Sequence, residues 1–200
     1  MRSFHSALLM AAALTIAAVP AGAQISFSNS YTFIKAVKDR DGNKVTDILS
    51  SPGTFVINTK ESGSGNGALH IVALDRDLTW LSFLLGKGAK ADLQNEDGNT
   101  ALMVASQIGW IDGAELLLRR GAAVDLANNR GETPLMLAVQ NRDTAMVRLL
   151  LAKGADAKRT DNVAGYSALD YAKRDGRAAA IVKMLEEPAK PAREMAGPKL

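Results

Sequence analysis

Residues 98–105 read Gly-Asn-Thr-Ala-Leu-Met-Val-Ala, and residues 131–138, 33 positions later, read Gly-Glu-Thr-Pro-Leu-Met-Leu-Ala. A second pair of segments repeats at the same offset. Residues 115–122 read Glu-Leu-Leu-Leu-Arg-Arg-Gly-Ala, and residues 148–155 read Arg-Leu-Leu-Leu-Ala-Lys-Gly-Ala. A fixed period of this length predicts a stack of similar units, none of which buries its apolar face alone.

The same period extends the pattern in both directions. Gly65 precedes Gly98 by the same offset, whereas Gly165 opens a further unit one position later than that offset from Gly131 predicts, which indicates one inserted residue. An earlier segment, residues 30–58, matches only in outline. We expect one domain over residues 24–187, an all-α solenoid of about five helix-turn-helix units with short hairpin-like finger loops. The expected units are residues 29–61, 62–94, 95–127, 128–161 and 162–187.

The repeated motif resembles that of the ankyrin-repeat family. The residues that carry this resemblance are Gly131, Thr133-Pro134-Leu135, Ala138, Leu150-Leu151 and Gly154-Ala155-Asp156. Matches of this kind extend over about residues 65–185. The position of the family's histidine holds Met103, Met136 and Asp170 in three of the units. The resemblance implies a non-catalytic, protein-binding solenoid.

Several residue types repeat at positions that suit the ends and the core of helices. Thr100, Thr133 and Ser167 each precede a first helix, where a hydroxyl accepts an N–H of the first turn. Pro134 suits the first helical position, because the N–H that it lacks has no partner there. We expect left-handed glycines after the second helices, at Gly88, Gly121 and Gly154. Leucines should interlock between units, namely Leu102, Leu117, Leu135, Leu150, Leu169 and Leu185.

The first unit has local signals of its own. Ser30 is expected to cap a short helix with apolar positions at Tyr31, Phe33, Ile34 and Val37. A turn at Asp41-Gly42 then leads to a second helix that ends before Pro52-Gly53. Residues 54–58, Thr-Phe-Val-Ile-Asn, are predicted to be extended.

Both ends of the chain differ in composition from the repeats. Arg2, an apolar run over residues 7–19 and the small residues Ala21-Gly22-Ala23 predict a signal peptide, residues 1–23, cleaved before Gln24. The apolar run is too short for a transmembrane helix, which needs about 20 apolar residues. We therefore expect no stable membrane insertion after cleavage, and a periplasmic or secreted protein of bacterial origin. Residues 188–200 have too few apolar groups to fold and are predicted to be disordered.

The bulk composition excludes several functional classes. The 200 residues include no cysteine, so disulfides, thiolate metal sites and cysteine nucleophiles are absent from the chain. The formal net charge is only +3, which is a weak argument for nucleic acid as a partner. We expect no nucleic-acid binding, no cofactor and a monomer.

Few residues are candidates for catalysis or for metal and phosphate binding. His70 is the only histidine after His5, and it occupies the position at which the resembling family bonds its loop backbone. Gly63-Ser64-Gly65-Asn66-Gly67 lacks the following lysine of a phosphate-binding loop and is interpreted as a turn. An alternative hypothesis is a metal-dependent enzyme that uses the loop carboxylates Asp92, Asp97 and Asp161.

Since few residues are candidates for catalysis, the surface of the solenoid is the main candidate for a functional site. In the resembling family, partners usually dock on the finger loops and on the exposed side of the first helices. The corresponding positions here are Asn66, Leu74, Asp75, Asp97, Asn99, Gln107, Ile108, Arg130, Glu132, Gln140, Asn141, Tyr166 and Arg174. A rigid concave scaffold suits a protein partner, because docking then costs little conformational entropy.

These observations predict an exported scaffold that binds a protein partner, of unknown identity, through its concave face and finger loops. A sharper hypothesis is a chaperone-like or inhibitory partner of an exported enzyme. A secreted effector is a further alternative.

Overall fold

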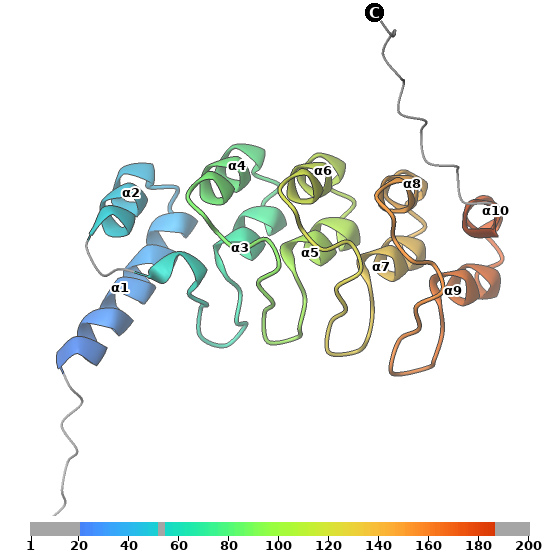
Figure 1. Ribbon diagram of the computed structural model, residues 1–200, viewed down its shortest axis with the longest axis horizontal. Coiled ribbons are helices and arrows are strands. Elements are labelled where there is room, and N and C mark those ends of the chain that lie inside the picture. Colours follow the sequence, from blue (N-terminus) through green and yellow to red (C-terminus); the bar gives the residue numbers. More distant parts are fainter. Residues whose placement is uncertain (1–20, 52–54, 187–200) are drawn as a thin grey trace, which may run out of the picture.

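The computed structural model describes residues 21–51 and 55–186 (Figure 1). In these residues ten α-helices form five pairs, so the predicted all-α repeat solenoid is confirmed. The pairs are α1 (Ala21–Lys38) with α2 (Gly42–Ser50), α3 (Ala68–Leu74) with α4 (Leu78–Gly86), α5 (Ala101–Gln107) with α6 (Ile111–Arg119), α7 (Pro134–Gln140) with α8 (Thr144–Ala152), and α9 (Ala168–Arg174) with α10 (Ala179–Glu186). A short 3-10 helix, η1 (Val56–Asn58), precedes the second pair.

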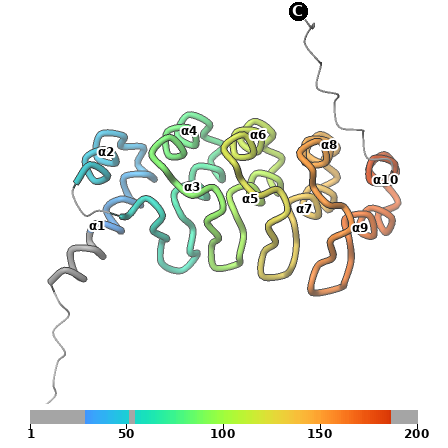
Figure 2. The backbone as a smooth tube through the Cα atoms, viewed as in Figure 1, coloured from blue at the N-terminus to red at the C-terminus, as the bar shows by residue number. Residues whose placement is uncertain are grey.

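The five pairs stand side by side in two rows of helices. Each first helix contacts the next along the inner row, α1 with α3, α3 with α5, α5 with α7 and α7 with α9. In the outer row, α4 contacts α6, α6 contacts α8 and α8 contacts α10. The finger loops leave the body on one common edge and lie next to one another (Figure 2). Each unit thus contacts mainly its neighbours, as in other repeat arrays.

The first helices of the later pairs begin where the sequence predicts. The Thr100, Thr133 and Ser167 hydroxyls accept the backbone N–H three residues ahead, at 3.3, 3.4 and 3.2 Å. Pro134 is the first residue of α7. These caps satisfy donors that have no partner within the helix.

Three of the second helices, α2, α4 and α8, begin at aspartates that the sequence analysis did not assign as caps. Asp41, Asp77 and Asp143 each accept the backbone N–H three residues ahead, at 2.9, 3.0 and 2.9 Å. Aspartate is a favoured N-cap residue, and its charge also suits the positive end of a helix dipole. The same aspartate directly before an apolar helix was therefore a signal available in the sequence.

One continuous apolar core runs between the two rows of helices. Leu102, Leu117, Leu135 and Leu150 are fully buried, and Leu185 is nearly so, as the sequence predicts. Leu169 in the last unit is only partly buried, although it packs against the same core. At an end unit, one side of the inner row has no further helix among the described residues to cover it, which explains the difference.

The finger loops are hairpin-like and bond to one another. Asn95 N donates to Asn99 O at 2.9 Å, and Asn128 N donates to Glu132 O at 3.0 Å, which closes two of the fingers. Successive fingers are joined by the backbone bonds Glu96 N to Ser64 O (3.1 Å), Asn129 N to Asp97 O (3.0 Å) and Asn162 N to Arg130 O (2.8 Å). Gly98 shows how close the approach is, because a Cβ there would lie 2.6 Å from Asn129 N.

A second set of contacts between units comes from arginines in the turn that joins the helices of a pair. Arg40, Arg76 and Arg142 have positive φ, and Gly109 takes the equivalent position in the third pair. Each arginine reaches the following unit. Arg40 binds Asp75 and Asp77 at 2.7 and 2.8 Å, Arg76 donates to Ile108 O, and Arg142 binds Asp175 at 2.9 Å.

Two local predictions for the first unit are wrong. Ser30 caps no helix, because α1 starts at Ala21 and passes through it, with no proline in between to stop the helical backbone. Residues 56–58 form η1 rather than an extended segment. This turn buries Val56, while the Asn58 side chain accepts the backbone N–H of Lys90 in the next unit at 2.8 Å.

The predicted left-handed glycines are confirmed, with φ of 91° at Gly88, 88° at Gly121 and 87° at Gly154. Residues 1–20 of the predicted signal peptide and the predicted disordered tail, residues 188–200, lie outside the described residues. The position before Gln24 at which we predict cleavage falls within α1. Among the helices that the structure describes, none combines the length and apolar character that a membrane span needs.

Candidate functional site

The expected partner-binding residues come from two places in each unit, the end of the first helix and the finger loop. Leu74, Gln107, Gln140 and Arg174 are the last residues of α3, α5, α7 and α9, and all four are exposed. The finger residues meet these helix ends directly in the last two units. Gln140 Nε2 lies 3.3 Å from Glu132 Oε1, and Arg174 Nη1 lies 2.9 Å from the Tyr166 hydroxyl oxygen.

An apolar residue lies three positions before each of these helix ends. Ile71, Val104 and Leu137 are buried, with only 7–8% of their surface exposed. The partly buried Tyr171 takes this position in α9. Residues three apart lie on one side of a helix, so each apolar residue shares its face with the exposed helix end. The inner row therefore presents small apolar areas flanked by polar groups from the helix ends and the fingers.

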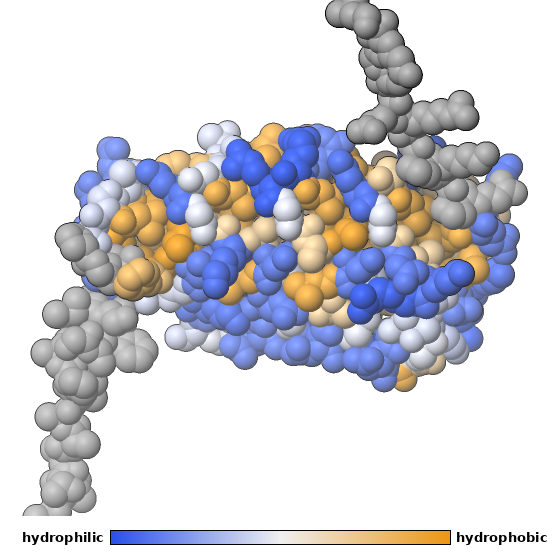
Figure 3. Space-filling model, viewed as in Figure 1, coloured by the Kyte–Doolittle hydropathy of each residue, from blue (hydrophilic) through white to orange (hydrophobic). Residues whose placement is uncertain are grey.

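The finger edge itself is mostly hydrophilic. In Figure 3 hydrophilic side chains follow the edge where the fingers lie, and a hydrophobic band crosses the body between that edge and the outer helices. Val163, in the last finger, is an exception and is 69% exposed. The finger edge therefore offers mainly hydrogen-bonding and charged groups.

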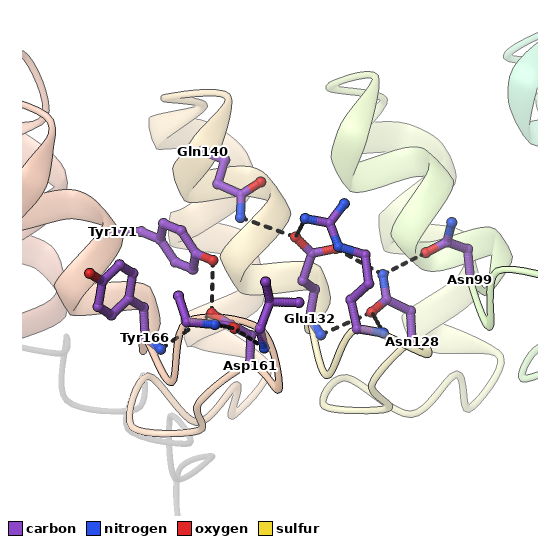
Figure 4. Close-up of polar contacts among 10 residues, drawn as sticks. Asn99, Asn128, Glu132, Gln140, Asp161, Tyr166 and Tyr171 are labelled. Atoms are coloured by element: carbon purple, nitrogen blue, oxygen red, sulfur yellow. Dashed lines mark hydrogen bonds and ion pairs between the residues drawn. The ribbon is translucent and has the colours of Figure 1, made fainter.

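Glu132 differs from the expectation, because its side chain is buried at 5% exposure. Its carboxylate accepts hydrogen bonds from Asn128 Nδ2 at 3.1 Å and from Gln140 Nε2 at 3.3 Å, and Arg130 lies 3.6 Å away (Figure 4). A buried carboxylate needs such partners. Glu132 therefore holds Arg130 and Gln140 in place and is not itself presented to solvent.

Two other expected contact residues are also partly engaged. Asn66 Oδ1 accepts from Asn95 Nδ2, and Asn99 Oδ1 accepts from Asn128 Nδ2, both at 2.9 Å. Asn95 and Asn128 also use Oδ1 to accept backbone N–H groups within their own fingers. These amides set the shape and spacing of the fingers, which sequence reasoning did not detect. The signal was present, since Asn95 and Asn128 are separated by one full repeat period.

Two aromatic side chains meet in the last unit. The Tyr166 and Tyr171 rings pack edge to face with centroids 5.6 Å apart, and the Arg174 guanidinium lies 4.7 Å from the Tyr166 ring centre. The Tyr171 hydroxyl donates to Asp161 Oδ2 (Figure 4). Burial, the bond to Asp161 and the charges of Asp161 and Glu132 raise the pKa of Tyr171 to about 12.

The sequence of this chain also matches a known protein family. A family model described as ankyrin repeats, in three copies, matches residues 33–128, 69–161 and 112–194. The chain belongs to the ankyrin-repeat family. Ankyrin repeats act as protein-interaction scaffolds, and the family is generally non-catalytic. The tight set of finger loops and inner helices described above is thus an ankyrin-repeat surface.

The histidine of the second ankyrin repeat has a structural role. His70 is fully buried, its Nδ1 accepts from Gly67 N at 3.2 Å, and its Nε2 lies 2.8 Å from Asn99 O. Since Nδ1 is an acceptor, the proton is on Nε2, which donates to Asn99 O. Burial lowers the pKa of His70, and the charge of Lys60 lowers it further. In the last repeat Asp170 replaces this histidine and accepts the Ser167 N–H.

Two of the three loop carboxylates of the metal-enzyme hypothesis, those of Asp92 and Asp161, are engaged in bonds between or within repeats, whereas Asp97 is exposed at a finger tip. Asp92 Oδ1 accepts Ala123 N at 2.9 Å, and Asp161 accepts the N–H groups of Val163, Ala164 and Tyr166. Over the residues that the structure describes, no three His, Cys, Asp or Glu side chains are placed to hold a metal ion. No observation in the described repeats therefore favours this alternative.

Proposed function

We propose that this ankyrin-repeat protein is exported and binds a protein partner through its concave face and finger loops. The observation that carries the proposal is the pairing of helix ends with fingers, seen in the contacts of Gln140 with Glu132 and of Arg174 with Tyr166. These contacts support a surface that is ordered before binding. An ordered surface loses little conformational entropy when a partner docks.

The composition of the surface also suits a protein partner. Tyrosine and arginine are the residues most often found at the energetic centres of protein interfaces, together with tryptophan. Here Arg130, Tyr166 and Arg174 come from the last two repeats, and all three are at least partly exposed. The proposed mechanism is complementarity of shape and hydrogen bonding, without covalent chemistry.

The proposed compartment is the periplasm, with secretion as the alternative. Arg2, the apolar run over residues 7–19 and Ala21-Gly22-Ala23 support a cleaved signal peptide. Mass spectrometry of the protein purified from fractionated cells tests this proposal. We expect a periplasmic chain that begins at Gln24, and a cytoplasmic chain that keeps residues 1–23 would contradict it.

Partner capture tests the binding surface. The chain is used as bait in extract of the compartment where it resides, with a triple variant Arg130→Ala, Gln140→Ala and Tyr166→Ala. We expect the variant to lose a dominant partner while it stays folded, with a modest loss of thermal stability because Gln140 and Arg130 contact the buried Glu132 carboxylate. The control is Asp112→Ala, Thr144→Ala and Arg148→Ala, three exposed residues of the outer helices. Equal capture by the surface variant and the control would contradict the proposal.

A further inference from the structure

Charge is distributed unevenly over the concave face. The finger closed by Asn95 and Asn99, here named the second finger, exposes Glu96 and Asp97 at its tip, whereas the last two repeats expose Arg130 and Arg174. The acidic residues near these two arginines are buried or already bonded. The tip of the second finger is therefore acidic, whereas the two exposed residues Arg130 and Arg174 of the last repeats are basic.

Arg174 is held in position by an aromatic side chain and not by an acid. Its Nη1 donates to the Tyr166 hydroxyl at 2.9 Å, and its guanidinium stacks 4.7 Å from the centre of the Tyr166 ring. Among the described residues, no carboxylate forms an ion pair with it. A planar guanidinium held in this way keeps donors free for a carboxylate, which it can bind through two parallel hydrogen bonds.

Arg130 is similarly available. Its side chain is 66% exposed, and its contact with Glu132 is long, 3.6 Å from Nη2 to Oε1. Both oxygens of Glu132 already accept side-chain amides, Oε2 from Asn128 and Oε1 from Gln140. The Arg130 guanidinium can therefore bind a second anion without leaving a buried carboxylate unpaired.

The other acids of the last repeat are engaged as well. Asp161 accepts three backbone N–H groups and the Tyr171 hydroxyl. Asp170 accepts from Ser167, and Asp175 binds Arg142 at 2.9 Å. These three carboxylates keep their charge but form no ion pair with Arg130 or Arg174 in the part of the chain that the structure describes, so both guanidinium groups keep donors for a carboxylate from outside the chain.

We propose that the last two repeats bind a linear acidic segment of the protein partner, whose carboxylates pair with Arg130 and Arg174. This inference rests on the proposed function and adds the chemistry of the partner. An apolar or aromatic side chain of the segment packs against the partly exposed Tyr166. The acidic part lies over the fourth and fifth helix pairs, since Glu96 and Asp97 would repel it at the second finger. The same two acids disfavour a long nucleic acid, which would be anionic along its whole length.

Selection from a phage-displayed library of random linear peptides tests this inference with the full chain as target. We expect the selected peptides to carry two or more Asp or Glu residues and an aromatic or large aliphatic residue. Their affinity should fall about tenfold or more in the double variant Arg130→Gln and Arg174→Gln, and should weaken as salt rises. The matched control is Arg120→Gln with Arg148→Gln, two exposed arginines of the outer row.

Several outcomes of the peptide selection would overturn the inference. The selected peptides could lack acidic residues, or the library could yield no binder. Acidic peptides could also bind the Arg130→Gln and Arg174→Gln variant as tightly as they bind the control variant. Tighter binding of a single-stranded oligonucleotide than of any peptide would overturn it too. If partner capture depends on Gln140 and Tyr166 but not on the two arginine charges, the proposed function stands and the acidic segment does not.

Discussion

The Tyr171 hydroxyl donates a hydrogen bond of 2.7 Å to Asp161 Oδ2 in the last ankyrin repeat. Asp161 follows Asn128 by one repeat period, and both side chains accept backbone N–H groups of their own finger. The other polar atom of each side chain, Nδ2 of Asn128 and Oδ2 of Asp161, has a different role in the two residues. Asn128 Nδ2 donates to Asn99 and Glu132, whereas Asp161 Oδ2 accepts from Tyr171. The change from amide to carboxylate thus matches the change from an acceptor to a donor neighbour.

We predict that Asp161→Ala destabilises the protein by about 1–3 kcal/mol, because backbone donors in the last finger lose their acceptor. Urea unfolding followed by circular dichroism measures this change. Asp156→Ala is the control, because that aspartate is exposed and its carboxylate accepts the Lys158 N–H of its own short turn. Equal effects of the two variants would show that the finger does not depend on the Asp161 carboxylate.

The Asp161 effect should depend on pH. Burial acts to raise the pKa of Asp161, but the bonds from Ala164, Tyr171, Val163 and Tyr166 outweigh it and lower the pKa from 3.8 to about 2. A lowered folded-state pKa means that the carboxylate stabilises the fold above pH 3.8, and that this contribution is lost as the pH falls toward 2. The stability difference between the parent chain and Asp161→Ala should shrink over that window. A constant difference would contradict the assignment.

His70 should make stability fall as the solution is acidified below the ordinary histidine range. Burial lowers its pKa from 6.5, so on acidification the unfolded chain takes up a proton before the folded chain does. Stability is then highest above pH 6.5 and decreases toward the folded-state pKa. NMR of the imidazole should show a neutral ring in the folded protein at pH 6.5. His70→Gln should flatten the pH dependence in this range, and an unchanged slope would assign it to other groups.

Truncation of Leu135 should lower the stability of the protein, whereas truncation of Leu74 should leave stability almost unchanged. Leu135 is fully buried and Leu74 is 53% exposed. Leu135→Ala is expected to cost about 2–5 kcal/mol of stability, as buried leucines do, while Leu74→Ala changes it by less than about 0.5 kcal/mol. Folded Leu135→Ala should still capture the partner. Urea unfolding and partner capture together test whether packing and binding are separable.

Arg142 tests whether backbone conformation or an ion pair matters more in the turns. Its φ is 56°, and a non-glycine residue there costs about 1–2 kcal/mol, whereas its exposed pair with Asp175 contributes about 0–1 kcal/mol. We therefore expect Arg142→Gly to be neutral or slightly stabilising and Arg142→Val to be destabilising. Thermal unfolding compares the two variants. A large loss of stability in the glycine variant would show that the Asp175 contact dominates.

Much of the fold was predictable from local chemistry. The caps at Thr100 and Thr133 and the left-handed glycines follow from short-range rules, which hold because helix ends need partners close in sequence. The start of α1 and the turn η1 were not predicted, because the first pair departs from the repeated pattern. The structure places Val56 in the core through η1, a requirement set by neighbours distant in sequence.

The candidate surface was predicted less completely than the fold. The helix ends Gln107, Gln140 and Arg174 are exposed as expected, since repeat period alone assigns their face. Glu132 was placed on the surface but is buried, because its burial depends on amides from Asn128 and Gln140. The repeat period predicts the face of the solenoid on which a residue lies. It does not predict the side chains to which that residue will bond.

By itself, the sequence determined the repeat, the order of the helices and the family, because a fixed period of apolar, capping and glycine positions admits few packed arrangements. Only the tertiary structure decided which polar groups of the concave face are bonded internally and which are free. Those pairings join residues of neighbouring repeats, such as His70 with Asn99 and Arg142 with Asp175. They depend on distances across the stack, which spacing along the chain does not specify.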